Sequence, residues 1–342
     1  MNRYIYLSLI AVIFSLLATS CEKPEQAVVL PPKTGSAYAT VEMGEEYTEQ
    51  VFFDFESGNV VYTSKVNSWD LAFETGPLGY HVFLNGGMRN MVYNTHQTDI
   101  RAVKTPPNIK STDYGPDKWF FDATSGSVDS TGFGDWRSAS SSAMSKNEVY
   151  IITSDAAHFP DSFKKVQLVG VTDKEYIMLY GDLRSENVRE IKIPKDDNYN
   201  FSYFSFKSEG VVYPDPPKKT WDIVFTRYRH VYYDQPDMPY FPYVVSGVLI
   251  NPYNTTAAVD SSVAYENLKI DKILSLDFKN NRDMIGFSWK QYSIEKGLYT
   301  VNPKRLFIIK NRDGEYWKLH FLDFYNKQGV KGSPSFEYER IQ

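Results

Sequence analysis

The sequence has 342 residues, of which 42% are hydrophobic and 16% aromatic, and its formal net charge is −5. This length allows two domains of ordinary size, and so much aromatic surface excludes a disordered chain. The mild negative charge argues against a nucleic-acid partner, because such proteins normally carry a basic face. The 26 Tyr and 22 Phe residues favour strands over helices.

The first segment has the features of a targeting signal. Arg3 precedes an apolar run, residues 4–17, that is short for a membrane span, so residues 1–20 are predicted to be a signal peptide. Small residues then lead to Cys21, the only cysteine of the chain, as in a bacterial lipobox. We therefore expect Cys21 to carry a lipid anchor; the alternative is an ordinary secretory signal followed by a chance cysteine.

Residues 21–38 follow as an extended, proline-containing tether. The mature chain is then predicted to have no disulfide and no transmembrane helix, and to reach the membrane only through its lipid. The expected location is the outer membrane or the cell surface of a bacterium.

One short pattern occurs twice in the chain. Trp69-Asp70 and Trp221-Asp222 each precede an apolar run that is typical of a buried strand. Each pair also follows an aromatic segment, residues 51–55 in the first copy and 202–206 in the second. Similarity on both sides of a motif indicates a duplicated unit. We predict an N-terminal unit over residues 39–187 and a C-terminal unit over residues 188–342.

Each unit is predicted to end in an antiparallel meander of three strands. The expected strands lie at residues 148–152, 163–171 and 175–181 in the first unit, and at 305–310, 316–324 and 335–339 in the second. Residues 262–268 are the best candidate for a short helix. The predicted fold class is all-β, with two related antiparallel β-sandwich-like units in tandem. Whether these units pack tightly or exchange strands is left open.

The second unit resembles the HmuY family, the haem-binding surface lipoproteins of the Bacteroidetes. The residues that carry the resemblance are 203–206, 210–212, 221–225, 227–228, 247–249, Trp289, 304–309, 313–314, 318–319, 323–325 and 332–338. The resemblance implies an all-β fold, haem as the bound cofactor, and transfer of haem to an outer-membrane transporter.

The resemblance also places the ligand loops. In the family, two axial side chains hold the haem iron, and the corresponding segments here are residues 277–286 and the hairpin at 289–299. That hairpin has no His and no Met, so the bis-His pattern is absent. The donors left at these positions are Met284, Tyr292 and Tyr299, which are the predicted ligand-binding residues. The alternative is that they pack on the end of the sandwich.

The five histidines are His81, His96, His158, His230 and His320. None has the spacing of a zinc site, so no dedicated metal centre is predicted. His230 lies with Tyr232 in an aromatic segment, residues 228–243. This segment is predicted either to bind a planar ligand or a glycan, or to pack as a loop on a sheet edge. His230 and Tyr232 complete the candidate ligand-binding set.

Catalysis is not predicted, because the sequence lacks nucleophile, phosphate-loop and dinucleotide motifs. Asp70 and Asp222 are instead expected to accept hydrogen bonds at strand ends. Two functions follow. The first is a non-catalytic surface lipoprotein that binds haem or a similar porphyrin for uptake. The second is an HmuY-like protein without haem binding that acts as a protein- or glycan-binding surface module.

Overall fold

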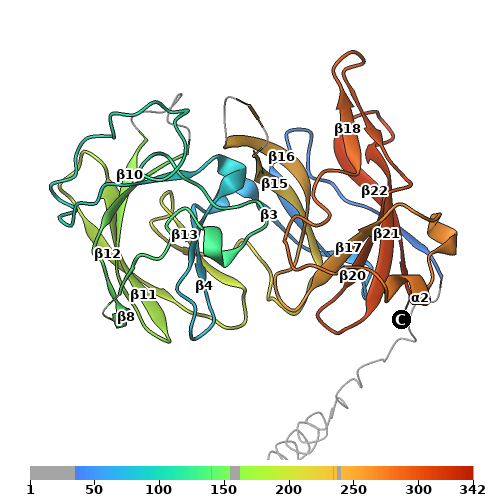
Figure 1. Cartoon of the computed structure of the whole chain (residues 1–342), viewed down its shortest axis with the longest axis horizontal. Coiled ribbons are helices and arrows are strands. Elements are labelled where there is room, and N and C mark those ends of the chain that lie inside the picture. Colours follow the sequence, from blue (N-terminus) through green and yellow to red (C-terminus); the bar gives the residue numbers. More distant parts are fainter. Residues whose placement is uncertain (1–34, 140, 155–161, 234, 237–239, 342) are drawn as a thin grey trace, which may run out of the picture. The chain divides into compact units, whose positions relative to one another are not determined.

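A computed structural model describes residues 35–341, apart from 140, 155–161, 234 and 237–239. The predicted signal peptide and Cys21 lie outside the described residues. The prediction of an all-β fold is confirmed: the described part is built from antiparallel sheets with only short helical turns (Figure 1). No helix in this part is both long and apolar enough to cross a membrane.

Two sheets form the part that contains the C-terminal meander. The first sheet has the strand order β1 (Ala37–Thr40), β22 (Lys331–Arg340), β21 (Tyr316–Tyr325), β20 (Leu306–Lys310) and β17 (Thr256–Asp260). The second has the order β16 (Phe241–Ile250), β15 (Ile223–Tyr232), β2 (Glu49–Asp54) and β3 (Asn59–Lys65). A separate hairpin consists of β18 (Lys290–Ser293) and β19 (Leu298–Val301).

Two further sheets form the part that contains the first meander. One has the order β14 (Gly210–Val212), β13 (Phe201–Ser205), β4 (Leu71–Glu74) and β5 (Val82–Leu84). The other has the order β12 (Arg189–Pro194), β11 (Glu175–Asp182), β10 (Lys164–Val171), β8 (Ser141–Ser145) and β7 (Arg137–Ser138). In the same sheet β9 (Val149–Thr153) also pairs with β10, and β6 (Met91–Asn94) pairs with β9. Both predicted meanders are present, as β9–β10–β11 and β20–β21–β22.

Among the described residues, helical structure is confined to single turns. The 3₁₀ turns are Val66–Ser68, Gly86–Met88, Val128–Ser130 and Tyr265–Asn267, and the described α-helix is α2 (Ile270–Ile273). The predicted helix at 262–268 therefore contains only the 3₁₀ turn, and α2 begins beyond it.

The two parts exchange their first hairpins. β2, which precedes the first Trp-Asp pair, lies beside β15, which follows the second pair, with Phe53 opposite Ile223. β13, which precedes the second pair, lies beside β4, which follows the first, with Phe204 opposite Leu71. Each Trp-Asp strand is thus completed by the aromatic strand of the other repeat.

Matched hydrogen bonds fix both exchanged strands. Asp222 accepts the backbone N–H of Phe55 at 2.8 Å, and Asp70 accepts that of Phe206 at 2.8 Å. The role expected for the two carboxylates at strand ends is confirmed. Phe52 also meets Trp221 edge-to-face at 5.0 Å between ring centroids, and Tyr203 meets Trp69 in the same way at 5.0 Å.

The exchange places each aromatic strand in the core of the other repeat. Phe53, Phe55 and Ile223 belong to one buried cluster, together with Trp289 and Trp317 of the C-terminal strands. Phe204 and Leu71 belong to a second cluster, built mainly from the N-terminal strands. Burial of these large side chains is the main driving force that holds the exchanged hairpins in place.

Candidate functional site: an aromatic face beside the 290–301 hairpin

Three of the described histidines are committed to other partners. His81 lies 2.6 Å from a carboxylate oxygen of Glu74, and His96 lies within 3.0 Å of Asp117 and Glu148. His320 contacts Glu337 at 3.0 Å and stacks on Tyr265. His158 lies outside the described residues. Among the described histidines, His230 alone lies in an aromatic cluster at the sites suggested by the sequence.

His230 and Tyr232 lie on one face near the end of β15. Their rings meet edge-to-face at 4.6 Å, and Phe287 closes on His230 from the adjoining loop at 5.1 Å. Across the sheet, Tyr243 of β16 is opposite His230 and Phe241 is opposite Tyr232. The aromatic segment at 228–243 is therefore not simply a loop: its two ends belong to the paired strands β15 and β16, which fixes the spacing of the rings on those strands.

The β18–β19 hairpin supplies the remaining predicted aromatic side chains. Tyr292 and Tyr299 are direct cross-strand partners, with ring centroids 5.0 Å apart. Tyr299 also packs edge-to-face on Phe324 at 5.0 Å, and its backbone N–H donates to the Tyr325 hydroxyl at 2.7 Å. One ring of the pair is therefore seated on the C-terminal sheet, while Tyr292 remains 50% exposed.

A buried lysine ties this hairpin to β16. The Lys290 Nζ donates to the Ser246 carbonyl oxygen at 2.5 Å and to the Ser246 hydroxyl at 3.0 Å. It also lies 4.3 Å from the ring centroid of Phe324 and 5.4 Å from that of Tyr299. Burial lowers the pKa of Lys290 to about 7, because the charged form loses its hydration.

The contacts of Lys290 with Ser246 join the hairpin that carries Tyr292 and Tyr299 to the strand that carries Phe241 and Tyr243. Burial raises the pKa of Tyr299, and Tyr243 of β16 adds to this shift. Phe241 and Tyr243 are stacked at 6.4 Å. We call the resulting surface the aromatic face; it consists of His230, Tyr232, Phe241, Tyr243, Tyr292 and Tyr299. Figure 1 shows β15 beside β16, and the contact of Lys290 with Ser246 ties the β18–β19 hairpin to β16.

Four of the five side chains proposed from the sequence thus form two ring pairs, one on β15 and one on the hairpin that Lys290 ties to β16. The fifth, Met284, is half-buried against the C-terminal core, in the loop that also carries Phe287. Phe287 and Lys290 were not singled out by sequence reasoning. Phe287 adjoins the predicted ligand loop, but no spacing signal connects it to β15. Lys290 is an ordinary surface residue type, and only the fold shows that it is buried.

The described residues contain no group of three or more His, Cys, Asp or Glu side chains arranged to hold a metal ion. The aromatic face can instead hold a flat apolar molecule, because exposed rings at fixed spacing offer stacking surfaces. Among the six residues of the aromatic face, only His230 has a side-chain nitrogen that can bind iron.

The sequence matches one known protein family over most of its length. The family model described as HmuY protein matches residues 46–338. The chain belongs to the HmuY family. The match includes both Trp-Asp pairs and the whole aromatic face, so both repeats fall within one HmuY region.

Solved structures similar to this HmuY family member share low sequence identity. A putative HmuY-like haem-binding protein from Bacteroides vulgatus is 12% identical, with 92% of this chain and 96% of that chain covered and a TM-score of 0.25. A putative lipoprotein from Bacteroides fragilis is 12% identical, with 92% and 95% covered and a TM-score of 0.25. The apo HmuY analogue from Tannerella forsythia is also 12% identical, with 91% and 97% covered and a TM-score of 0.25. No curated protein matches the chain.

Proposed function

We propose that this HmuY family member is a non-catalytic surface lipoprotein that captures haem or a similar porphyrin for uptake. Family membership supports a binding role. In this proposal Cys21 carries the lipid that anchors the protein to the outer membrane or cell surface. The captured molecule passes to an outer-membrane transporter.

The observation that carries the proposal is the aromatic face. A porphyrin is broad, flat and apolar, so it gains most from several rings at fixed spacing on one surface. Phe241, Tyr243 and Tyr292 are 37%, 57% and 50% exposed, which leaves them available to a ligand. Burial of these rings under a porphyrin would remove apolar area that now faces water.

The proposed ligand contacts are His230, Tyr232, Met284, Tyr292 and Tyr299. His230 supplies the iron donor in this scheme, with the rings of Tyr232, Tyr292 and Tyr299 around the porphyrin and Met284 as the thioether nearest to it. A single imidazole differs from the bis-His arrangement implied by the family resemblance. The ferric complex is therefore expected to have a spectrum other than that of a bis-His haem.

Substitution of His230 tests the donor assignment. Haemin added to the wild-type protein should produce a shifted Soret band in the ferric and ferrous states. His230→Ala should change the position of that band, because it removes the iron-bound imidazole, whereas His96→Ala should leave it unchanged. Identical spectra for wild type and His230→Ala would reject His230 as the donor. No Soret shift in either redox state at micromolar haemin would reject haem capture.

The second candidate function is a protein- or glycan-binding surface module without haem. The tip of the 290–301 hairpin favours it, because Ile294 is 91% exposed and Leu298 is 51% exposed. Exposed aliphatic side chains at a hairpin tip suit contact with another protein better than contact with a porphyrin. A protein that shows no Soret shift would be assigned to this second function.

A further inference from the structure

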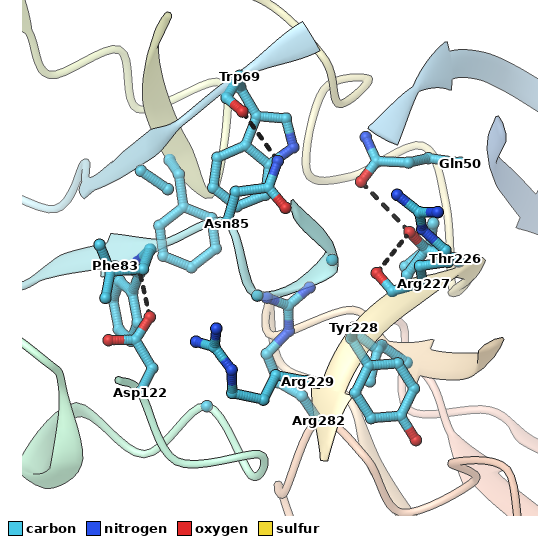
Figure 2. Close-up of a pocket in the computed structure, with 18 of the residues that line it drawn as sticks. Gln50, Trp69, Phe83, Asn85, Asp122, Thr226, Arg227, Tyr228, Arg229 and Arg282 are labelled. Atoms are coloured by element: carbon cyan, nitrogen blue, oxygen red, sulfur yellow. Dashed lines mark hydrogen bonds between the residues drawn. The ribbon is translucent and has the colours of Figure 1, made fainter. Parts of the chain in front are cut away.

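A separate cavity of about 110 Å³ lies where the two hairpins exchange. Gln50 and Phe52 reach it from β2, and Phe201 and Tyr203 reach it from β13. Its lining also includes Trp69 and Phe83, and Figure 2 shows these two rings on the side away from Arg227. Both exchanged strands therefore contribute to one cavity, which does not include any residue of the aromatic face.

Three arginines line this cavity: Arg227, Arg229 and Arg282 (Figure 2). Arg229 is 6% exposed; its Nη1 donates to the Asn90 carbonyl oxygen at 2.7 Å, and its guanidinium lies 4.8 Å from the Phe121 ring. Arg282 lies over the Phe201 ring at 5.8 Å. Arg227 contacts the Met88 sulfur at 3.5 Å. None of these four contacts is to a carboxylate.

Several N–H groups at the cavity are buried without an acceptor. Within the described part of the chain, the Nε atoms of Arg227 and Arg282 have no hydrogen-bond partner, nor does Nε1 of Trp69. A buried N–H without an acceptor costs about 1–3 kcal/mol. Such groups are rare in folded proteins, and these three belong to residues that line one cavity.

The charges around the cavity leave an excess of positive charge. Asp122 acts on Arg229, and Asp215 lies near Arg282 and hydrogen-bonds with the Tyr203 hydroxyl. Burial raises the pKa of both carboxyls to about 6, so both remain largely ionised at pH 7.5. Burial lowers the pKa of Arg229 to about 10, so Arg229 is charged. Three guanidinium groups minus two carboxylates leave one uncompensated positive charge.

We propose that this cavity binds a small molecule bearing an oxyanion, a carboxylate or a phosphate, held by Arg227 and Arg282. Guanidinium groups recognise both oxyanions through paired N–H donors. The volume exceeds that needed for one water by several fold, so a small organic or inorganic anion fits. Trp69 and Phe201 give the site an apolar wall for a ligand that carries a flat carbon skeleton.

The site also has a consequence for the fold. An anion at this position contacts residues on both sides of the exchange, since Arg227 lies on β15 and Phe201 on β13. Binding therefore stabilises the folded state that contains the exchanged hairpins. The proposal is independent of the porphyrin function, because the two sites share no residue.

Thermal unfolding of the full chain tests the proposal, with sodium phosphate and sodium benzoate as the two probes and sodium chloride at equal ionic strength as the reference. One or both probes should raise the midpoint above the chloride value. Isothermal titration should show that Arg282→Gln and Arg227→Gln each weaken binding by about tenfold or more. A response to benzoate alone identifies a carboxylate site, and a response to phosphate alone identifies a phosphate site.

Arg305→Gln is the matched control. Arg305 also has a buried Nε without a partner, and it lies over the Phe307 ring at 5.9 Å, but it is not in the cavity lining. Its variant should bind as the wild type does. If the cavity variants fail to fold, the wild-type protein is treated instead with a reagent that modifies arginine side chains. The probe should then protect Arg227 and Arg282 but not Arg305. The proposal would be overturned if neither probe raised the unfolding midpoint above the chloride value. It would also be overturned if the cavity variants bound the probe as tightly as the wild type, or if the probe did not protect Arg227 and Arg282 selectively.

Discussion

Replacement of Asp222 by Ala is expected to lower the free energy of unfolding by about 3–5 kcal/mol. The Asp222 side chain is fully buried and accepts two hydrogen bonds, from the Phe55 N–H at 2.8 Å and from the Arg312 guanidinium at 2.7 Å. Arg312 bridges further to Asp54 at 2.9 Å. The variant would leave a buried guanidinium short of one carboxylate and would remove the acceptor that fixes the exchanged strand.

Asp70→Ala is the matched variant in the other repeat, and its cost should be smaller, about 1–3 kcal/mol. Asp70 accepts the Phe206 N–H in the same geometry, but the basic group that acts on it is Lys164, which ion-pairs with Asp182. The Asp70→Ala variant therefore leaves no buried cation without its main carboxylate partner. Urea denaturation followed by tryptophan fluorescence measures both losses. Equal losses for the two variants would contradict the assignment of the larger cost to the Arg312 pair.

The Lys290→Met variant is expected to remove a pH dependence of stability. The folded-state pKa of Lys290 is about 7, whereas an unfolded lysine keeps its usual value of 10.5. Between these values the unfolded chain binds one more proton, so the contribution of Lys290 to the free energy of unfolding rises with pH. The rise is at most about 1.4 kcal/mol per pH unit. Below pH 7 Lys290 is charged in both the folded and the unfolded chain, so burial of the charge lowers the free energy of unfolding by its full amount.

Methionine keeps the length of the lysine side chain and its packing on Phe324, but it has no proton to gain. The difference in unfolding free energy, wild type minus Lys290→Met, should therefore increase by about 2 kcal/mol between pH 7 and pH 9. Urea denaturation at several pH values gives this difference directly. A difference that stays constant over this interval would show that Lys290 keeps an ordinary pKa in the folded protein.

The elements of the fold were largely predictable from local sequence. The meanders contain long β-branched and aromatic runs, and Asp313-Gly314 marks the turn between two of their strands. The Trp-Asp pairs were recognised because each recurs with the same neighbours. The tandem boundary at residues 187 and 188 remains a proposal. The connectivity between repeats was not predictable, because both aromatic strands suit either Trp-Asp strand equally well. Only the global packing decides between local pairing and exchange.

The site was predictable in part. Tyr292 and Tyr299 were found through their place in a hairpin, and His230 and Tyr232 through an aromatic-rich segment. That these residues share one surface depends on Lys290, whose contact with Ser246 spans 44 positions in the chain. No periodicity within one element encodes such a contact. The arginines of the cavity were missed for a similar reason: the strands that complete the cavity around them, β2 and β13, come from different repeats.

Binding of a porphyrin by the aromatic face is tested most directly by an equilibrium titration with haemin of the wild type and of the double variant Phe241→Ala/Tyr243→Ala. Each ring lost should cost about 0.5–1.5 kcal/mol beyond its buried area, so the double variant should bind at least about tenfold more weakly. Tyr38→Ala/Tyr213→Ala, which removes two exposed rings outside the face, should bind as the wild type does. Equal haemin affinity for the wild type and the Phe241→Ala/Tyr243→Ala variant would contradict binding of a porphyrin by this face.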